Sequence, residues 1–242
     1  MRNSKLTPVI LLLPLMAVTL TVIIACVNVL LQSIGYVPAF GLTKITLGYY
    51  REVFKRPEFL SALWVSLRIA FVSTLLAAAL GTLLCAALVK RRAGGGMLYT
   101  VRFPILVPHT VVALFIMTLL GQTGIVARAA YGLGLISDYT KFPQILFTPG
   151  YGGAIAGYLW KEIPFVAYYT LALMASVSNT LGEAAENLGA SPLRSFFSVT
   201  LPMSLPAVSK AALIIFIYAF GGYELPALLG STLPKALPVQ AY

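Results

Sequence analysis

Residues 183–202 read EAAENLGASPLRSFFSVTLP and make up the only long polar stretch in the second half of this chain. Apolar stretches flank it at about residues 152–177 and 206–229, and each is long enough to cross a bilayer as a helix of about 20 residues. Pro202 and Pro206 are expected to end any helix of the polar stretch before the second apolar stretch begins. The pattern predicts two membrane-spanning helices joined by a structured connection that faces water.

That connection, about residues 180–204, carries the signals of two short helices with a turn between them. Thr180 and Glu183 have the spacing of a capping box, in which both side chains bond free backbone amides at a helix start. Gly189 can adopt the left-handed conformation that ends a helix. Ser191 stands directly before a proline, an arrangement that favours a new helix start. We expect a helix–turn–helix lying across the membrane surface, with small residues at its tip.

The composition places the whole chain in a bilayer. Of its 242 residues, 59% are hydrophobic and only 10% are charged, whereas soluble domains carry about 25% charged residues. Five long apolar runs predict an all-α, polytopic membrane helix bundle that forms a single transmembrane domain over residues 1–242. The expected spans are, in order, residues 8–32, 59–89, 97–120, 152–177 and 206–229.

Small residues and prolines indicate the shape of individual spans. Ala77 and Gly81 lie four residues apart in the second span, a spacing that suits close packing of helices in lipid. Pro104 and Pro108 are expected to bend the third span. The Gly-Gly-Tyr-Glu sequence at residues 221–224, followed by a nearby proline, predicts a break in the outer part of the fifth span.

The formal charge of +10 has a simple explanation in a membrane protein. On a soluble domain it would suggest a nucleic-acid partner, but here the Lys and Arg residues gather at span ends, so no nucleic acid is expected. The two sides of the membrane receive equal numbers of cations, which leaves the orientation open. Since the densest cluster is Lys90–Arg92, we place it in the cytoplasm together with the N-terminus and residues 180–204.

The polar stretch also has a distinctive spacing. It runs Glu-Ala-Ala, three residues, Gly, nine residues, an aliphatic residue, one residue, Leu-Pro, and the matching positions are Glu183, Ala184, Ala185, Gly189, Val199, Leu201 and Pro202. This pattern resembles the signature loop of permease subunits of bacterial type I ATP-binding-cassette importers. Residues 108–110, 160–164 and 226–230 are similar to the branch of that family that includes spermidine and putrescine permeases.

The resemblance implies a six-span core in the bacterial cytoplasmic (inner) membrane, and the final span is missing here, which we interpret as a truncated subunit. It also implies a second permease subunit, a different chain, together with two ATPase subunits and an extracytoplasmic solute-binding protein. ATP and magnesium would be bound by the ATPases, so no cofactor is expected in this chain. The loop would dock in a cleft of the ATPase through Glu183, Ala184, Ala185, Leu188, Gly189, Ala190, Ser191, Pro192, Val199, Leu201 and Pro202.

Polar side chains inside the spans are candidates for a solute pathway, because charges are costly in a bilayer and usually face a cavity. Glu162 and Glu224 would favour a cationic solute if they face the pathway. Alternatively, Lys161 and Glu162 have structural partners on other helices, Glu224 lies near the headgroups, and His109 is a hydrogen-bonded packing residue. The pathway candidates are His109, Trp160, Lys161, Glu162, Tyr223 and Glu224.

The sequence contains no phosphate-binding loop and no cluster of His or Cys with metal-ligand spacing, so the chain is not expected to be an enzyme. The resemblance implies a permease that forms half of the pathway of an ATP-driven importer, for a small polar or cationic solute such as a polyamine. An organophosphonate, iron(III) or a sugar remains an open choice of solute. The alternative functions are an ATP-independent channel or secondary transporter, and a membrane-anchored structural or assembly protein.

Overall fold

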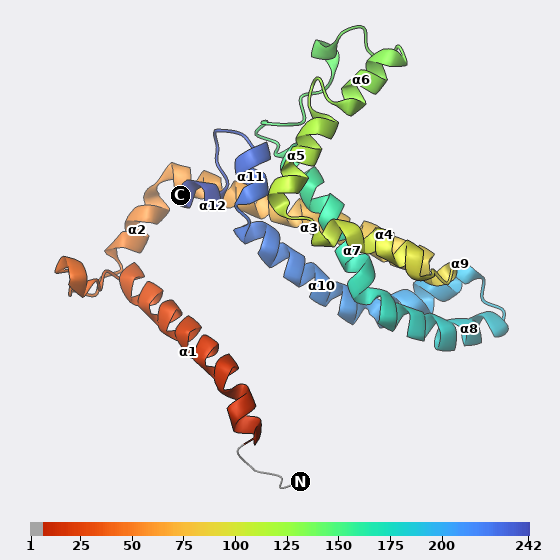
Figure 1. The fold of residues 1–242 in the computed structure, drawn as a ribbon, viewed down its shortest axis with the longest axis horizontal. Coiled ribbons are helices and arrows are strands. Elements are labelled where there is room, and N and C mark those ends of the chain that lie inside the picture. Colours follow the sequence, from red (N-terminus) through yellow and green to blue (C-terminus); the bar gives the residue numbers. More distant parts are fainter. Residues whose placement is uncertain (1–6) are drawn as a thin grey trace. The chain divides into compact units, whose positions relative to one another are not determined.

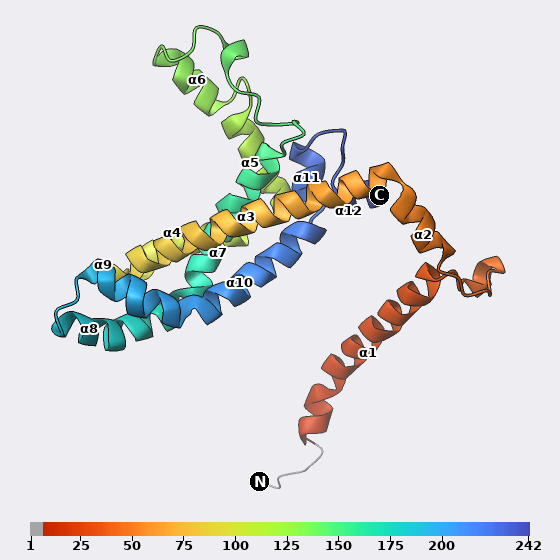
Figure 2. The ribbon, with the colours of Figure 1, turned by 180° about the vertical axis from the view of Figure 1, so that it is seen from behind.

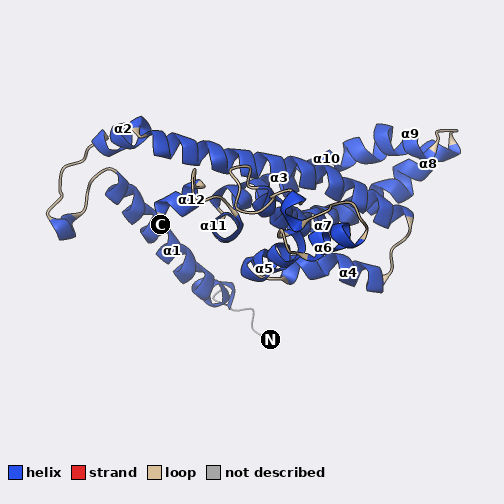
Figure 3. Ribbon diagram, turned by 90° about the horizontal axis from the view of Figure 1, so that it is seen from above, coloured by secondary structure: helices blue, strands red, loops and turns tan. Residues whose placement is uncertain are grey.

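The structure, a computed structural model, describes residues 7–242, and within this range it contains helices and loops but no extended strand (Figure 3). The prediction of an all-α fold is confirmed. Arg2 and Lys5, two cations that precede the first expected span, lie outside the described residues. The expected single domain is divided into two compact units, Met1–Phe59 and Leu60–Tyr242.

The first unit holds the apolar helix α1 (Thr7–Ser33), the short turn η1 (Pro38–Phe40) and helix α2 (Gly48–Lys55). Every residue of α1 from Ile10 to Leu30 is exposed. The Tyr50 hydroxyl donates a hydrogen bond of 2.8 Å to Ser33 Oγ and so ties α2 to the end of α1. An apolar helix without a buried face is suited to lipid as its surroundings.

The second unit is a bundle of helices. Its elements are α3 (Pro57–Lys90), of which Leu60 onward belongs to this unit, α4 (Gly95–Leu106), α5 (His109–Leu120), α6 (Ile125–Gly132), η2 (Tyr139–Lys141), α7 (Gly152–Val177), η3 (Ser178–Gly182), α8 (Glu183–Asn187), α9 (Pro192–Ser195), η4 (Phe196–Thr200), α10 (Leu201–Gly221), α11 (Glu224–Leu229) and α12 (Leu237–Ala241). Figures 1 and 2 show α7 crossing between α4 and α10.

Helix α7 is the centre of the bundle and packs against α4, α5, α10 and α11. The close approach of α3 to α7 depends on Gly81, because a Cβ there would lie 2.7 Å from the Ile163 carbonyl oxygen and from Val166 Cβ. Ala77, one turn away, is fully buried. The packing role predicted for the small residues Ala77 and Gly81 is confirmed.

Four helices of the described chain are long and apolar enough to cross a membrane: Ile10–Ser33, Pro57–Lys90, His109–Gly132 and Pro192–Gly221. Helix α7 is not among them, because Lys161 and Glu162 lower its hydropathy. Because α7 packs against α4, α5, α10 and α11, much of its surface faces protein and does not need to be uniformly apolar.

The expected third span, residues 97–120, is interrupted rather than bent. Helix α4 ends at Leu106 and α5 begins at His109, with Val107 in an extended conformation between them. Pro108 causes this break, since a residue before proline is driven out of the helical region. The predicted break in the fifth span is confirmed, because α10 ends at Gly221 and α11 begins at Glu224.

Candidate functional site

The polar loop, defined here as residues 178–200, grows directly out of α7. The helix widens into the π-helical segment η3 and continues as α8 without a break. The Thr180 hydroxyl donates a hydrogen bond of 2.8 Å to the Ser176 carbonyl, one helical turn earlier in the chain. The predicted capping box of Thr180 and Glu183 is therefore wrong, because a continuous helix already supplies the backbone partners that a cap would replace.

The turn at the tip of the loop has the geometry that the sequence predicted. Gly189 has φ +94°, in the left-handed region. Its amide donates a hydrogen bond of 2.9 Å to the Glu186 carbonyl, and the Ala190 amide donates one of 3.0 Å to the Ala185 carbonyl. This pair of bonds is the Schellman motif, which satisfies the last carbonyls of a helix.

The second arm starts as predicted but ends differently. Ser191 caps α9, since its hydroxyl accepts a bond of 3.3 Å from the Arg194 amide, and Pro192 occupies the first turn. From α9 the helix runs through the π-helical segment η4 into α10. Pro202 and Pro206 do not end the helix, contrary to the prediction. The wider turn of η4 comes just before Pro202, where the chain lacks an amide for the ordinary helical bond.

A small buried polar contact among Gly182, Ser195 and Thr200 joins the two arms of the loop. Ser195, at the end of α9, donates a hydrogen bond of 3.0 Å from its Oγ to the carbonyl oxygen of Gly182, at the end of η3. A Cβ on Gly182 would lie 3.2 Å from Thr200 Oγ1, so a residue larger than glycine would push the arms apart. Ser195 and Thr200 are both buried. The two π-helical segments thus face each other across polar side chains, whereas most helix contacts of the bundle are apolar.

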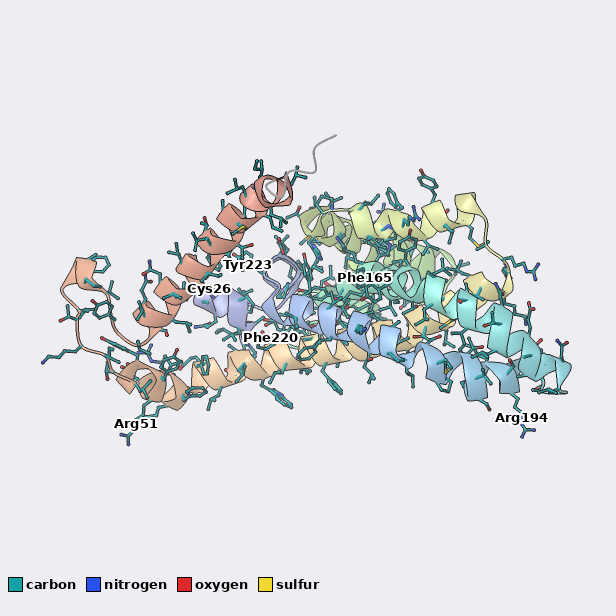
Figure 4. All side chains as sticks on the ribbon, turned by 90° about the horizontal axis from the view of Figure 1, so that it is seen from below. Cys26, Arg51, Phe165, Arg194, Phe220 and Tyr223 are labelled. Carbon is teal, nitrogen blue, oxygen red and sulfur yellow. The ribbon has the colours of Figure 1, made fainter. Side chains whose placement is uncertain are left out.

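Apolar side chains stand exposed near the tip of the loop. Leu188 is 90% exposed and Leu193 is 72% exposed. Arg194 projects from the same end of the molecule (Figure 4). Exposed leucines beside charged residues are typical of a protein-binding surface. The signature residues Val199, Leu201 and Pro202 lie instead along η4 and the start of α10, away from the turn.

A second candidate site is a cavity of about 220 Å³ among α4, α5, α7 and α10. Its lining residues are Ile105, His109, Lys161, Glu162, Phe165, Ile214, Ile215 and Tyr218. Glu162 is only 5% exposed, and neither of its carboxylate oxygens has a hydrogen-bond partner among the described residues. A carboxylate without a partner in an apolar surrounding is costly, so this cavity is suited to a ligand that supplies one.

Lys161 is held away from Glu162. Its ammonium group donates a hydrogen bond of 2.5 Å to the carbonyl oxygen of Val107, at the break between α4 and α5. The break leaves that carbonyl without a helical partner, and the lysine supplies one. The alternative in which Glu162 is paired with a neighbouring helix finds no such pair in the described chain.

The other pathway candidates lie around this cavity at different places. His109 Nδ1 lies 3.4 Å from the Tyr218 hydroxyl, and Tyr218 also lines an adjoining open pocket with Tyr223 and Glu224. Trp160 is not in either pocket and packs on the rings of Phe103 and Phe115. Sequence reasoning missed Tyr218, because a tyrosine in an apolar run gives no local sign of facing a cavity.

Metal chemistry has no support in the described part of the chain, where no three His, Cys, Asp or Glu side chains gather. The two sites are thus a helix–turn–helix with exposed leucines and a cavity that holds an unpaired carboxylate.

Comparison with known proteins defines the family. Residues 77–240 match the family described as "Binding-protein-dependent transport system inner membrane component". The match covers more than half of the chain, so this protein belongs to that family.

Several curated proteins are similar to this chain. The putrescine transport system permease protein PotI of Escherichia coli K12 is 24% identical over 201 residues, which cover 80% of this chain and 64% of PotI. The chain thus spans less than two thirds of that relative's length. The sn-glycerol-3-phosphate permease UgpA of Pectobacterium atrosepticum is 28% identical over 232 residues, covering 90% of this chain and 74% of UgpA. The trehalose permease SugA of Mycobacterium tuberculosis is 30% identical over 179 residues, which cover 73% of this chain and 56% of SugA.

A solved structure has the same fold. It is a bacterial alginate ABC transporter in complex with an alginate pentasaccharide-bound periplasmic protein, with a TM-score of 0.72 and 20% identity. The superposition covers 98% of this chain and 85% of the transporter chain.

Proposed function

We propose that this chain is the membrane-spanning permease subunit of an ATP-driven importer that receives its solute from an extracytoplasmic binding protein. The observation that carries the proposal is the polar loop, whose signature spacing folds into two helical arms around the Gly189 turn. Leu188 and Leu193 are exposed there without a partner in the bundle. A partner ATPase would cover them, which would remove apolar surface from water.

The loop is built to transmit force in both directions. Its arms continue into α7 and α10 as unbroken helices, so a displacement of the tip moves two helices of the central bundle. The same two helices supply Glu162 and Tyr218 to the cavity. Closure of an ATPase dimer would in this way rearrange the solute pathway, of which this chain forms half and a second permease subunit the other half.

In this proposal the protein lies in the bacterial cytoplasmic membrane and holds no cofactor, since ATP and magnesium belong to the two ATPase subunits. The solute is a small molecule with a cationic group, such as a polyamine. Support for this class comes from the buried Glu162, whose carboxylate has no hydrogen-bond partner within the described residues, and from Glu224 in the adjoining pocket. The relatives' names cover cationic, anionic and neutral solutes, whereas the carboxylates of the two pockets favour a cation.

The experiment is a Gly189→Val substitution in the complete complex reconstituted in liposomes with its ATPase and binding protein. A β-branched residue is strained at φ +94° by about 1–2 kcal/mol, which reshapes the turn without unfolding the bundle. We expect normal assembly, loss of solute uptake, and ATP hydrolysis that no longer responds to the loaded binding protein.

Gly94→Val is the matched control. Gly94 has φ −80° and an added Cβ meets nothing within 4 Å, so uptake and ATP hydrolysis should stay normal. Coupled uptake that survives Gly189→Val would contradict the role of the loop. Uptake that needs no ATPase chain at all would favour an ATP-independent channel or a secondary transporter.

A further inference from the structure

A cavity of about 540 Å³ lies beside the end of α3, on the side of the molecule that carries the polar loop. Its apolar lining consists of Leu88, Val89, Ala93, Leu98, Leu171 and Ala175, and its polar lining consists of Arg92, Asn179 and Glu183. None of these residues lines the cavity that contains Glu162, described above as the second candidate site. We refer to this cavity as the Arg92 cavity.

The polar part of the Arg92 cavity is only loosely paired. The Arg92 guanidinium lies 3.8 Å from the Glu183 carboxylate, and their side chains are 87% and 58% exposed. An ion pair of that length and exposure contributes little to stability. Arg92 can therefore exchange Glu183 for an anion of better geometry, and a phosphate accepts two parallel bonds from a guanidinium.

The position of the cavity selects the kind of anion. α3 is a helix of 34 residues that is apolar enough to cross a membrane, and Lys90, Arg91 and Arg92 follow one another at its end. Basic residues at the end of a spanning helix lie at the depth of the lipid headgroups. The cavity presents Arg92 and Asn179 beside a wall of leucine, valine and alanine side chains, so it matches a molecule with an anionic head and an apolar tail.

We propose that the Arg92 cavity binds one anionic phospholipid, with the headgroup phosphate on Arg92 and Asn179 and an acyl chain along Leu98 and Ala175. Arg92 is the cation that lines the cavity, and it faces the single carboxylate of Glu183. Lys90 and Arg91 make the adjoining surface basic, and this surface favours an anionic over a zwitterionic headgroup. The phosphate takes the place of that carboxylate. Glu183 is the first residue of α8, so lipid binding releases one end of the polar loop from the α3–α4 turn.

The test measures lipid retained by the purified full-length chain in neutral detergent, by native mass spectrometry, with phosphatidylglycerol and phosphatidylcholine of identical acyl chains as probes. We expect the chain to retain phosphatidylglycerol in preference. Arg92→Gln should lower its retention about fivefold, the effect of one basic contact at a membrane surface. Arg91→Gln removes the same charge from a residue that does not line the cavity and should lower retention much less than Arg92→Gln.

Two further variants keep the test decisive. Glu183→Gln removes the competing carboxylate and should raise phosphatidylglycerol retention, a gain that a folding defect cannot produce. Ala175→Leu fills the apolar part and should lower retention with all charges intact. Equal losses in Arg91→Gln and Arg92→Gln would show general surface attraction and overturn the proposal. Displacement of the lipid by inorganic phosphate, with no effect of Ala175→Leu, would also overturn it, since the site would then bind a free anion.

Discussion

At the scale of single residues, Glu162 makes the clearest functional prediction. Its buried carboxylate has no hydrogen-bond partner in the part of the chain that the structure describes, so a structural role would be poorly served by this side chain. Glu162→Gln should therefore leave the thermal unfolding midpoint unchanged or raise it. Uptake of the solute found on the partner binding protein should fall about tenfold or more, which corresponds to about 1.4 kcal/mol of lost interaction.

The control for Glu162 is Glu52→Gln. Glu52 is an exposed carboxylate on α2 that pairs with Arg56 at 2.5 Å, and exposed pairs of this kind contribute little. Its removal should change neither uptake nor unfolding. Unchanged uptake and unchanged solute preference in Glu162→Gln would remove this residue from the pathway.

At the scale of elements, the pairing of the two π-helical segments predicts how firmly the polar loop is held. Ser195→Ala removes the bond to the Gly182 carbonyl and should lower stability by about 1 kcal/mol. Hydrogen exchange of the amides in residues 183–190 should become faster, because the arms can separate. Ser209→Ala is the control, since its hydroxyl bonds the Leu205 carbonyl within its own helix. Equal rates of amide hydrogen exchange in the two variants would show that the bond between Ser195 and Gly182 does not restrain the loop.

The elements also show what sequence alone could and could not predict. The Gly189 turn and the Ser191 cap were predictable because they depend on residues within one turn of each other. The continuity of the loop with α7 and α10 was not, since it runs through the π-helical segments η3 and η4, which no sequence pattern indicated. Proline marked the region of the α4–α5 break, but the Lys161 side chain that satisfies the Val107 carbonyl comes from 54 positions away.

At the scale of the whole molecule, the apolar runs predicted the fold class and the spacing of residues 183–202 predicted the family, but neither predicted which helix forms the centre of the bundle. Helix α7 takes that position with a lysine and a glutamate in its middle, and hydropathy alone ranks it below the four membrane-crossing candidates. Orientation is not encoded by the charge count either, because the cations divide equally between the two sides. It must be decided by measuring which ends of the bundle are reached from outside the cell.

Cysteine labelling tests the orientation in a variant without Cys26 and Cys85. Leu135→Cys lies in the loop after α6, where the native side chain is 74% exposed, and Asn187→Cys lies in the polar loop. In intact cells with a permeable outer envelope, a membrane-impermeant maleimide should label position 135 and not position 187. Gly95→Cys should behave like position 187, because Arg92 lies 3.8 Å from Glu183 and the α3–α4 turn is therefore at the same end of the bundle as the polar loop. Labelling of 95 and 187 with protection of 135 would reverse the orientation and place the polar loop where no ATPase can reach it.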